Sequence, residues 1–533
     1  MRIKTVKIEN FRGYKEETSV DFDNLTAFVG KNDIGKSTVL EALDIFFNDG
    51  KGCVKLDKDD IHRSSSKEKQ EEERDIKISV VFDDLPDEVV IDDSYPTNLS
   101  SEYLLNKDGL LEVVKEYHNA GKAKVYLWAN HPQGECVRDL LSKKQTELKK
   151  MVKELSLNSD TRINSEMRHA IWEHYEDSLQ VGECKVDISK EDAKAIWTKL
   201  QTFLPVYSLF QSDRSNNDGD GEIQDPLRES VKQILNDDEV KNSLDAVYQK
   251  VAASLKDVAA RTVAKMAEMD GNLSETINPR IPSAEDLKWA DVFKNVSITG
   301  ENSIPMNKRG SGVRRLILLN FFRAEAESRE KSSVNAGIIY AIEEPETSQH
   351  AANQRLLAEA FKRLSESDNT QVVLTTHSAT MVKALTYDDI RIVEESESGK
   401  KEISRIETRI LGSPSLNEVN YLAFGEVTEE FHNELFGYLH ERVKAKRNDV
   451  GGIRKMDDWL SQQSGVPRVD SKHMNDYLGH KDATMPAYIR NYIDHPEEKV
   501  DANGNICREK PTSEDIRESI EFMVKLVKNQ QSI

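Results

Sequence analysis

The stretch Leu25-Thr-Ala-Phe-Val29-Gly30-Lys31-Asn32-Asp33-Ile34-Gly35-Lys36-Ser37-Thr38 decides the fold of this chain of 533 residues. A short apolar run of strand type precedes a Gly-x-x-x-x-Gly-Lys-Ser loop, and Leu40, Leu43 and Phe47 follow it at helical spacing. In such a loop, consecutive backbone N–H groups and the start of a helix surround phosphate. The stretch therefore predicts a phosphate loop between a strand and a helix of an α/β core.

Two later segments continue this pattern. The loop Arg309-Gly-Ser311-Gly312 can approach an anion closely through its glycine backbone, and the apolar strand Ile338–Ile342 ends in Glu343-Glu344-Pro345-Glu346. The carboxyl ends of parallel strands are the edge where such sheets present their ligands.

A nucleotide-hydrolysing site needs a metal ligand and a group that orients the attacking water. We assign Lys36 to the β- and γ-phosphates, Ser37 and Glu343 to Mg²⁺, and Glu344 to the water. His377 follows another buried strand, Gln371–Thr376, and we interpret it as a γ-phosphate sensor. If the two strands are neighbours, His377 lies beside the γ-phosphate.

The composition limits the class of protein. Charged residues make up 32% of the chain and hydrophobic residues 37%, and no apolar run of about 18 residues is long enough to span a bilayer. Four scattered cysteines without a Cys-x-x-Cys pair, and a start that is unlike a signal peptide, favour a cytoplasmic location. The net charge of −21 confines any DNA contact to a local basic strip.

The order of patterns predicts four regions. They are an N-terminal lobe with the phosphate loop (1–134), a mainly helical insertion with a core strand near 204–210 (135–285), a C-terminal lobe with the other motifs (286–412), and a helical C-terminal region (413–533). Apolar alternation predicts strands over Ile76–Phe82, Leu111–His118 and Ala123–Trp128, near Val292–Ile298 and over Ile403–Ile410. Residues 135–200 are predicted to be helical, and so is almost all of the tail beyond Ile410, with a helix from about Glu429 to Lys446 and a capping box that joins Thr512 to Asp515 ahead of the last helix.

The motifs described so far occur in a fixed order along the chain: Asn10-Phe-Arg12-Gly13, the phosphate loop, a degenerate signature loop, Glu-Glu-Pro-Glu and Thr-His-Ser. This order resembles the ABC-type ATPase heads of the SMC, Rad50 and RecF group, and within that group the OLD-like ATPases. The resemblance covers roughly 1–55 and 290–410. It implies a mixed sheet with a phosphate-loop core and an antiparallel edge, ATP and Mg²⁺ as cofactors, and a homodimer of heads or a higher even-numbered oligomer. It places Ser311 and Gly312 on the γ-phosphate bound to the opposite subunit, Thr347 and Ser348 in an inter-subunit loop, and Arg12 near the nucleotide or a nucleic acid. The predicted ATP contacts are Arg12, Gly30, Asn32, Gly35, Lys36, Ser37, Thr38, Ser311 and Gly312.

After His377 the chain offers Glu394-Glu395 but no later Asp-x-Asp at a strand end, so a built-in Toprim nuclease is not expected. The tail, over 420–440 and 485–530, instead resembles the helical C-terminus of stand-alone defence ATPases of the Septu type, the PtuA family, which is found alone or beside retrons. That resemblance implies a separate HNH nuclease of the PtuB kind as partner and, beside a retron, a reverse transcriptase with its msDNA.

Arg490, Asn491 and His495 also match the Arg-x4-x6-His pattern of HEPN ribonucleases, although Pro496 disfavours helical geometry at His495. We favour a hydrogen-bonding or nuclease-docking role for them. The prediction is an ATPase subunit that controls a partner nuclease in anti-phage defence. A DNA-repair ATPase and an ATP-gated ribonuclease stay open as alternatives.

Overall fold

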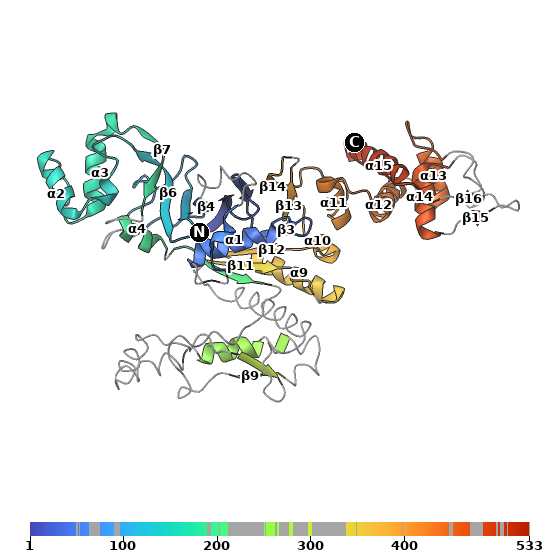
Figure 1. Ribbon diagram of the computed structural model, residues 1–533, viewed down its shortest axis with the longest axis horizontal. Helices are drawn as coiled ribbons and strands as arrows, with labels where there is room; N and C mark the ends of the chain where they lie inside the picture. Colours follow the sequence, from blue (N-terminus) through green and yellow to red (C-terminus); the bar gives the residue numbers. More distant parts are fainter. Residues whose placement is uncertain are drawn as a thin grey trace. The chain divides into compact units, whose positions relative to one another are not determined.

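The computed structural model describes residues 1–49, 52, 54–62, 75–89, 96–188, 193–201, 203–211, 250, 252–261, 264–265, 277–280, 297–300, 337–347, 349–396, 398–446, 451–469, 483–496, 499–500, 506–508 and 510–531 (Figure 1). Its contacts divide the chain into two compact units. The first comprises 1–28, 32–376 and 395–403, and the second 29–31, 377–394 and 404–533. Each unit is described by itself below.

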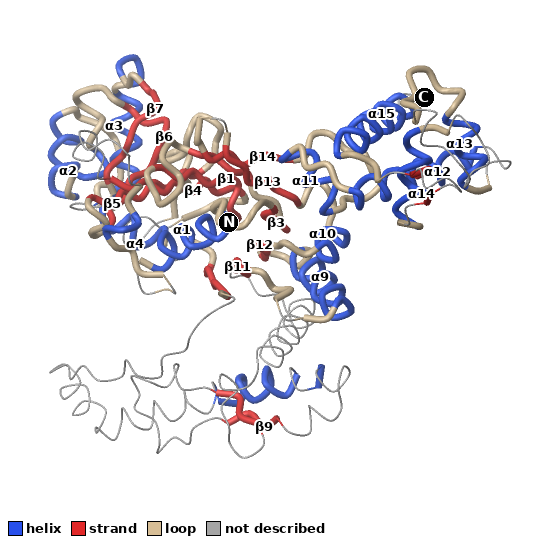
Figure 2. Tube along the Cα trace, turned by 45° about the vertical axis from the view of Figure 1, so that its right-hand side comes forward, coloured by secondary structure: helices blue, strands red, loops and turns tan. Residues whose placement is uncertain are grey.

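The first unit contains an antiparallel sheet in the order β2-β1-β4-β5-β6-β7, whose central strands Figure 2 shows side by side. The strands are β1 (Arg2–Glu9), β2 (Thr18–Asp21), β4 (Asp75–Asp83), β5 (Leu111–His118), β6 (Ala123–Pro132) and β7 (Val181–Asp187). Alternation along β1 buries Ile3, Val6 and Ile8, as expected of a sheet with one face on the core. The predicted strands over Ile76–Phe82, Leu111–His118 and Ala123–Trp128 are confirmed.

A second group of strands is parallel and runs in the order β3-β12-β11-β8. These are β3 (Leu25–Val29), β12 (Thr370–Thr375), β11 (Ile338–Glu343) and β8 (Val206–Phe210). Every residue of β3 and β12 is buried, as in parallel strands covered on both faces. The protein is therefore a mixed α/β protein with a parallel core and an antiparallel sheet.

Helices cover this core. Helix α1 (Lys36–Asn48) packs against β4, β8, β11 and β12, and α9 (Ala351–Ser365) packs against β12. The apolar face of α1 includes Val39, Leu43 and Phe46, which are fully buried. The 3-10 turn η1 (Lys58–Asp60) follows α1 along the chain and begins with a capping box at Asp57.

The region 135–200 is helical only in part. It forms α2 (Gln145–Glu154), α3 (Asn164–His174), α4 (Ala193–Leu200) and the 3-10 turns η3 (Leu140–Ser142) and η4 (Glu176–Ser178). The purely helical prediction is wrong at β7, which pairs with β6 over Val181–Asp187. The residues of β7 are half-exposed because the strand lies at the edge of the sheet. Its apolar pattern is therefore too weak to predict a strand from the sequence.

The second unit is mainly helical. Helices α11 (Leu416–Phe424), α12 (Glu429–Lys446), α13 (Ile453–Leu460), α14 (Met485–Asp494) and α15 (Ser513–Gln531) surround one apolar core that contains Phe431, Leu439, Ile489 and Ile520. The unit also contains α10 (Ala379–Ala384) and nearly all of β13 (Ile390–Glu395). The predicted bounds of α12 and the capping box that joins Thr512 to Asp515 are confirmed.

One prediction about the late chain needs correction. The predicted strand Ile403–Ile410 is shifted, because β14 covers Lys401–Arg405 and ends there. The described part of the tail is almost wholly helical, as predicted, and it also contains the short antiparallel pair of β15 (Lys499–Val500) and β16 (Ile506–Arg508). Strands β9 (Ile277–Arg280) and β10 (Ser297–Gly300) pair antiparallel. Of the strand predicted near Val292–Ile298, residues 292–296 lie outside the described residues, and β10 begins at Ser297.

Candidate nucleotide-binding site

Three neighbouring strand ends bring the sequence motifs to one sheet edge. Glu343 at the end of β11 lies opposite Thr375 of β12, and Thr375 lies opposite Phe28 of β3. The phosphate loop leaves β3, and the acidic motif leaves β11, at the carboxyl ends of parallel strands (Figure 1). This is the edge at which α/β sheets bind ligands.

The phosphate loop makes a tight turn into α1. Asp33 has a φ of 60° and Gly35 a φ of 109°, so both occupy the left-handed region, and Gly35 immediately precedes the first helical residue, Lys36. Ser37 and Thr38 belong to the first turn of α1, whose N–H groups have no partner within the helix. The N-terminus of α1 therefore has the backbone arrangement that binds phosphate.

Lys36 lies in an electrostatic setting that suits an anionic ligand. Its side chain is buried, and burial lowers the pKa of its ammonium group to about 8. The nearby carboxylates of Glu344, Asp33 and Glu346 partly offset this shift. The loop lysine and the acidic motif, which are far apart in the sequence, thus lie close enough to interact in the folded chain.

The acidic motif is held by β12. The backbone N–H of Glu344 donates to the carbonyl and to the hydroxyl oxygen of Thr375, each at 3.1 Å. The hydroxyl of Thr376, which is fully buried, donates to Glu346 at 2.8 Å. Glu344 has a φ of 38°, an uncommon conformation for a residue with a side chain, and such strain gathers at functional sites.

His377 follows Thr376 directly and belongs to the second unit. The next residue, Ser378, caps α10 by accepting hydrogen bonds from the N–H groups of Thr380 and Met381 at 3.2 and 3.3 Å. The neighbouring positions of β11 and β12, on which the assignment of His377 rests, are confirmed. Its role as a γ-phosphate sensor stays a prediction.

Arg12 is held by two carboxylates. Its guanidinium binds Glu41 of α1 and donates to Asp60 at 2.8 Å, and its backbone N–H donates to the Asp60 carbonyl at 2.7 Å. Burial disfavours the charged form of Arg12, but the hydrogen bonds that its guanidinium donates to Asp60 and Glu41, together with the charges of these two carboxylates, outweigh this effect, so the pKa of Arg12 is raised. In this structure Arg12 is a member of an ion-pair network with Glu41 and Asp60, and its contact with ATP stays a prediction.

Some predicted residues lie outside the described part of the chain. These are Ser311 and Gly312 of the signature loop, and Ser348 beside Thr347. Gly30, Asn32 and Glu343 are described. Gly30 is buried, Asn32 is exposed, and Glu343 is 8% exposed at the end of β11.

The C-terminal motif lies at the end of α14. Arg490 of α14 is ion-paired with Asp494, four residues along the same helix. Asn491 is 4% exposed, whereas His495 is exposed beyond the last residue of α14. The helix ends where Pro496 predicted it would.

The donor set fits a nucleotide with Mg²⁺. Within the described ranges, no three histidine, cysteine, aspartate or glutamate side chains gather into a ready-made metal cage. Mg²⁺ is commonly held by one or two carboxylates together with phosphate oxygens and waters, and Glu343 and Ser37 can supply the protein ligands. Among the described helices, none is long and apolar enough to cross a bilayer.

Three further residues of this site were not predicted. Thr376 and Glu346 form a hydrogen bond that joins β12 to the acidic motif, and Tyr14 donates to the Gly35 carbonyl at 3.0 Å. Thr376 and Glu346 belong to the Thr-His-Ser and Glu-Glu-Pro-Glu motifs, so their place in the sequence could have identified them as residues of this site. Nothing local distinguishes Tyr14, because its contact depends on residues 21 positions away.

Comparisons with known proteins extend this picture. One similar solved structure is an SMC head domain from Thermotoga maritima, with 14% identity, 76% of this chain and 100% of that chain covered, and a TM-score of 0.34. A second is an SMC head bound to the C-winged helix domain of ScpA, with 13% identity, 76% of this chain and 98% of that chain covered, and a TM-score of 0.41. Another is an SMC head with an extended coiled coil bound to the C-terminal domain of ScpA, derived from Pyrococcus furiosus. Its identity to this chain is 14%, the match covers 79% of this chain and 98% of that chain, and the TM-score is 0.38. No curated protein matches the chain. Residues 1–382 match the AAA ATPase domain family, and the chain therefore belongs to that family.

Proposed function

We propose that the chain binds and hydrolyses ATP with Mg²⁺ and thereby controls a partner nuclease in anti-phage defence. The observation that carries the ATPase proposal is the meeting of the phosphate loop and the acidic motif at the ends of β3 and β11, on either side of β12. Membership of the AAA ATPase domain family supports the same activity.

The residues act as follows in this proposal. The N–H groups of the loop and the Lys36 ammonium hold the phosphates, and Ser37 and Glu343 hold the metal. Mg²⁺ neutralises charge that builds up on the phosphate oxygens. Glu344 orients the attacking water, and the hydrogen bonds that its backbone N–H donates to Thr375 hold its backbone in place. His377 contacts the γ-phosphate.

Two substitutions test the ATPase. Lys36→Ala removes the buried cation, so binding of a fluorescent ATP analogue is expected to be lost. Glu344→Gln keeps the shape of the side chain but not the charge, so ATP stays bound while phosphate release slows by ~10²- to 10⁴-fold, the range for one acid–base group. Lys362→Ala and Glu359→Gln, both exposed on α9, are the matched controls. Wild-type turnover by Glu344→Gln would remove Glu344 from its proposed role.

The regulatory part rests on the Septu-like resemblance of the tail and on the separate core of the C-terminal helices. It predicts an HNH nuclease gene beside the gene for this chain, and a complex of both proteins after co-expression. Nuclease activity of that complex should change between ATP, a non-hydrolysable analogue and no nucleotide. If DNA stimulates ATP turnover of the chain alone, or the chain alone cuts RNA, a repair ATPase or a ribonuclease takes the place of this proposal.

A further inference from the structure

A buried tyrosine reaches the phosphate loop from the turn after β1. Tyr14 is fully buried, and its hydroxyl donates to the Gly35 carbonyl at 3.0 Å. The turn that carries it is closed by mutual backbone hydrogen bonds between Phe11 and Tyr14, each 2.9 Å long. The hydroxyl therefore comes from a fixed support rather than from a loose loop.

The carbonyl that accepts this bond has a special place in the loop. Gly35 has a φ of 109°, which favours glycine, and a Cβ atom built on it would lie 3.2 Å from the Tyr14 ring. Because a peptide unit is planar and trans, the Gly35 carbonyl and the Lys36 N–H point in opposite directions. A bond that fixes the carbonyl also fixes the direction of the Lys36 N–H, the first N–H of α1.

We propose that Tyr14 is a positioning residue of the nucleotide site: it anchors the Gly35 carbonyl beneath the loop and so turns the Lys36 N–H toward bound phosphate. The inference rests on the proposed ATP site and adds to it a residue outside the phosphate loop and the acidic motif. The same turn also contacts α1, because Arg12 forms an ion pair with Glu41. The segment Phe11–Tyr14 therefore contacts both the phosphate loop and the helix that follows it.

The test is Tyr14→Phe, which removes the hydroxyl and keeps the buried ring. The Gly35 carbonyl then loses its buried donor, and the affinity for ATP is expected to fall by ~5- to 30-fold, the effect of one lost buried hydrogen bond. Calorimetric titration with ATP and Mg²⁺ measures the affinity, and phosphate release gives KM and kcat separately. A positioning role in binding predicts a rise in KM that is larger than the fall in kcat.

Tyr117→Phe is the matched control. Tyr117 is a buried tyrosine on β5 whose hydroxyl donates to the Ile45 carbonyl at 3.4 Å, near the opposite end of the same helix. Both variants lose one hydroxyl bonded to a backbone carbonyl of this segment, so thermal unfolding compares their structural costs. Only Tyr14→Phe is expected to lose ATP affinity.

The outcomes separate this inference from the ATPase proposal. If Lys36→Ala abolishes ATP binding but Tyr14→Phe binds ATP like the wild type, Tyr14 has no positioning role and the ATPase proposal stands. If both tyrosine variants lose affinity equally, the effect is general destabilisation and the inference is also overturned. If Lys36→Ala retains normal ATP binding, the ATPase proposal itself fails.

Discussion

The buried environment of Lys36 disfavours the charged form of its amino group. Burial lowers its pKa from the ordinary value of 10.5 to about 8, although Glu344, Asp33 and Glu346 draw it upward. Between these two pH values the unfolded chain binds more protons at Lys36 than the folded chain does. The free energy of unfolding therefore rises with pH over this window, and at neutral pH the charged lysine is a cost to the fold. Bound phosphate would offset that cost.

This setting predicts a pH dependence of ATP binding. Below pH 8 the free protein already carries the proton that the phosphates require, so the affinity should be constant. Above pH 8 a proton must be taken up on binding, and the affinity should fall by about tenfold per pH unit. Calorimetric titrations in buffers of different ionisation enthalpy measure both the affinity and the proton uptake. A flat affinity from pH 7 to 9.5 contradicts the assignment of Lys36.

At the scale of elements, α1 is fixed at both ends. Its N-terminus is the phosphate loop, and near its C-terminus the buried Lys115 of β5 donates to the Phe46 carbonyl at 2.7 Å and pairs with Asp49. The ammonium also lies 5.0 Å from the centre of the Phe46 ring and 5.3 Å from that of Trp197 on α4. A cation at the C-terminus of a helix complements the helix dipole.

Lys115→Met tests this anchor. Methionine fills a similar volume but leaves the Phe46 carbonyl without its donor, so the free energy of unfolding should fall by about 1–3 kcal/mol. Urea unfolding followed by circular dichroism measures the loss. Lys124→Met, on the exposed side of the neighbouring strand β6, controls for the loss of one positive charge. Equal stabilities of the two variants would mean that Lys115 does not anchor α1.

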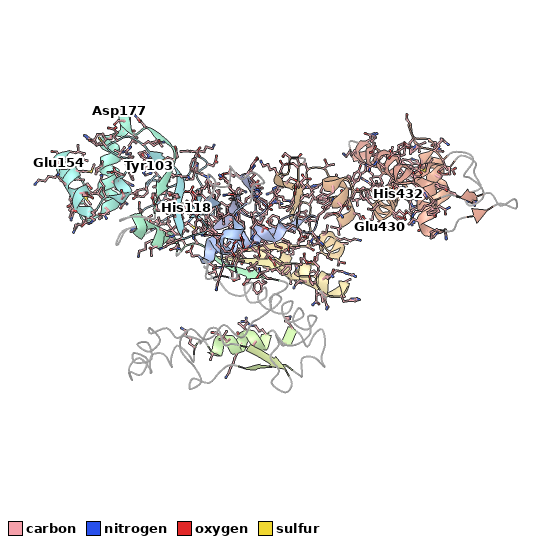
Figure 3. All side chains as sticks on the ribbon, in the orientation of Figure 1. Tyr103, His118, Glu154, Asp177, Glu430 and His432 are labelled. Atoms are coloured by element: carbon pink, nitrogen blue, oxygen red, sulfur yellow. The ribbon has the colours of Figure 1, made fainter. Side chains whose placement is uncertain are left out.

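The C-terminal helices contain a histidine that burial keeps neutral. His432 of α12, labelled in Figure 3, is fully buried and hydrogen-bonded through Nε2 to the hydroxyl of Ser519 on α15 at 2.8 Å. Burial, helped by the positive charge of Arg490, lowers its pKa to about 3. Between pH 3 and the ordinary value of 6.5 the unfolded chain binds more protons at this residue, so the stability of the helical unit falls as the pH drops below 6.5.

His432→Gln should remove part of this acid sensitivity. Glutamine can keep a hydrogen bond with Ser519, and it does not titrate. Hydrogen–deuterium exchange of α12 peptides at pH 7 and pH 5, corrected for intrinsic rates, should show a larger loss of protection in the wild type than in the variant. His350→Gln, at an exposed position in the first unit, should behave like the wild type.

How far the sequence predicts these elements depends on where their signals lie. The phosphate loop and α12 carry local signals, glycine spacing in one and an apolar stripe with charged ends in the other, and both stand where they were predicted. Strand β7 is an edge strand with half-exposed residues, and β14 contains Ile403 but ends before Ile406 and Ile410, so neither strand has a strong apolar period of its own. The bonds of Tyr14 and Lys115 join residues far apart in sequence, and no local pattern encodes such contacts.

At the scale of the whole molecule, the first two residues of the phosphate loop, Gly30 and Lys31, are grouped with the C-terminal helices. Val29–Lys31 belongs to the second unit, and the Lys31 ammonium lies 4.8 Å from the centre of the Phe424 ring and 3.6 Å from Glu426. Both partners stand at the C-terminus of α11, where Gly425 ends the helix with a φ of 62°. The ring, the carboxylate and the helix dipole all attract the cation.

This contact predicts a path from the loop to the C-terminal helices. Lys31 is about half exposed, so the contact adds little to stability, but a loop that tightens around phosphate would move Lys31 and change the protection of α11. Hydrogen–deuterium exchange of the full chain should show that ATP with Mg²⁺ alters exchange in α11 peptides of the wild type. In Lys31→Ala the ATP-dependent change in exchange of α11 should disappear, while ATP affinity stays within about twofold, since the cation lost is exposed.

Lys383→Ala is the control, because Lys383 is exposed on α10 in the same unit, and this variant should keep the wild-type response. If α11 responds to ATP equally in Lys31→Ala, the signal does not travel through this contact, and the control of a partner nuclease would need another connection between loop and helices.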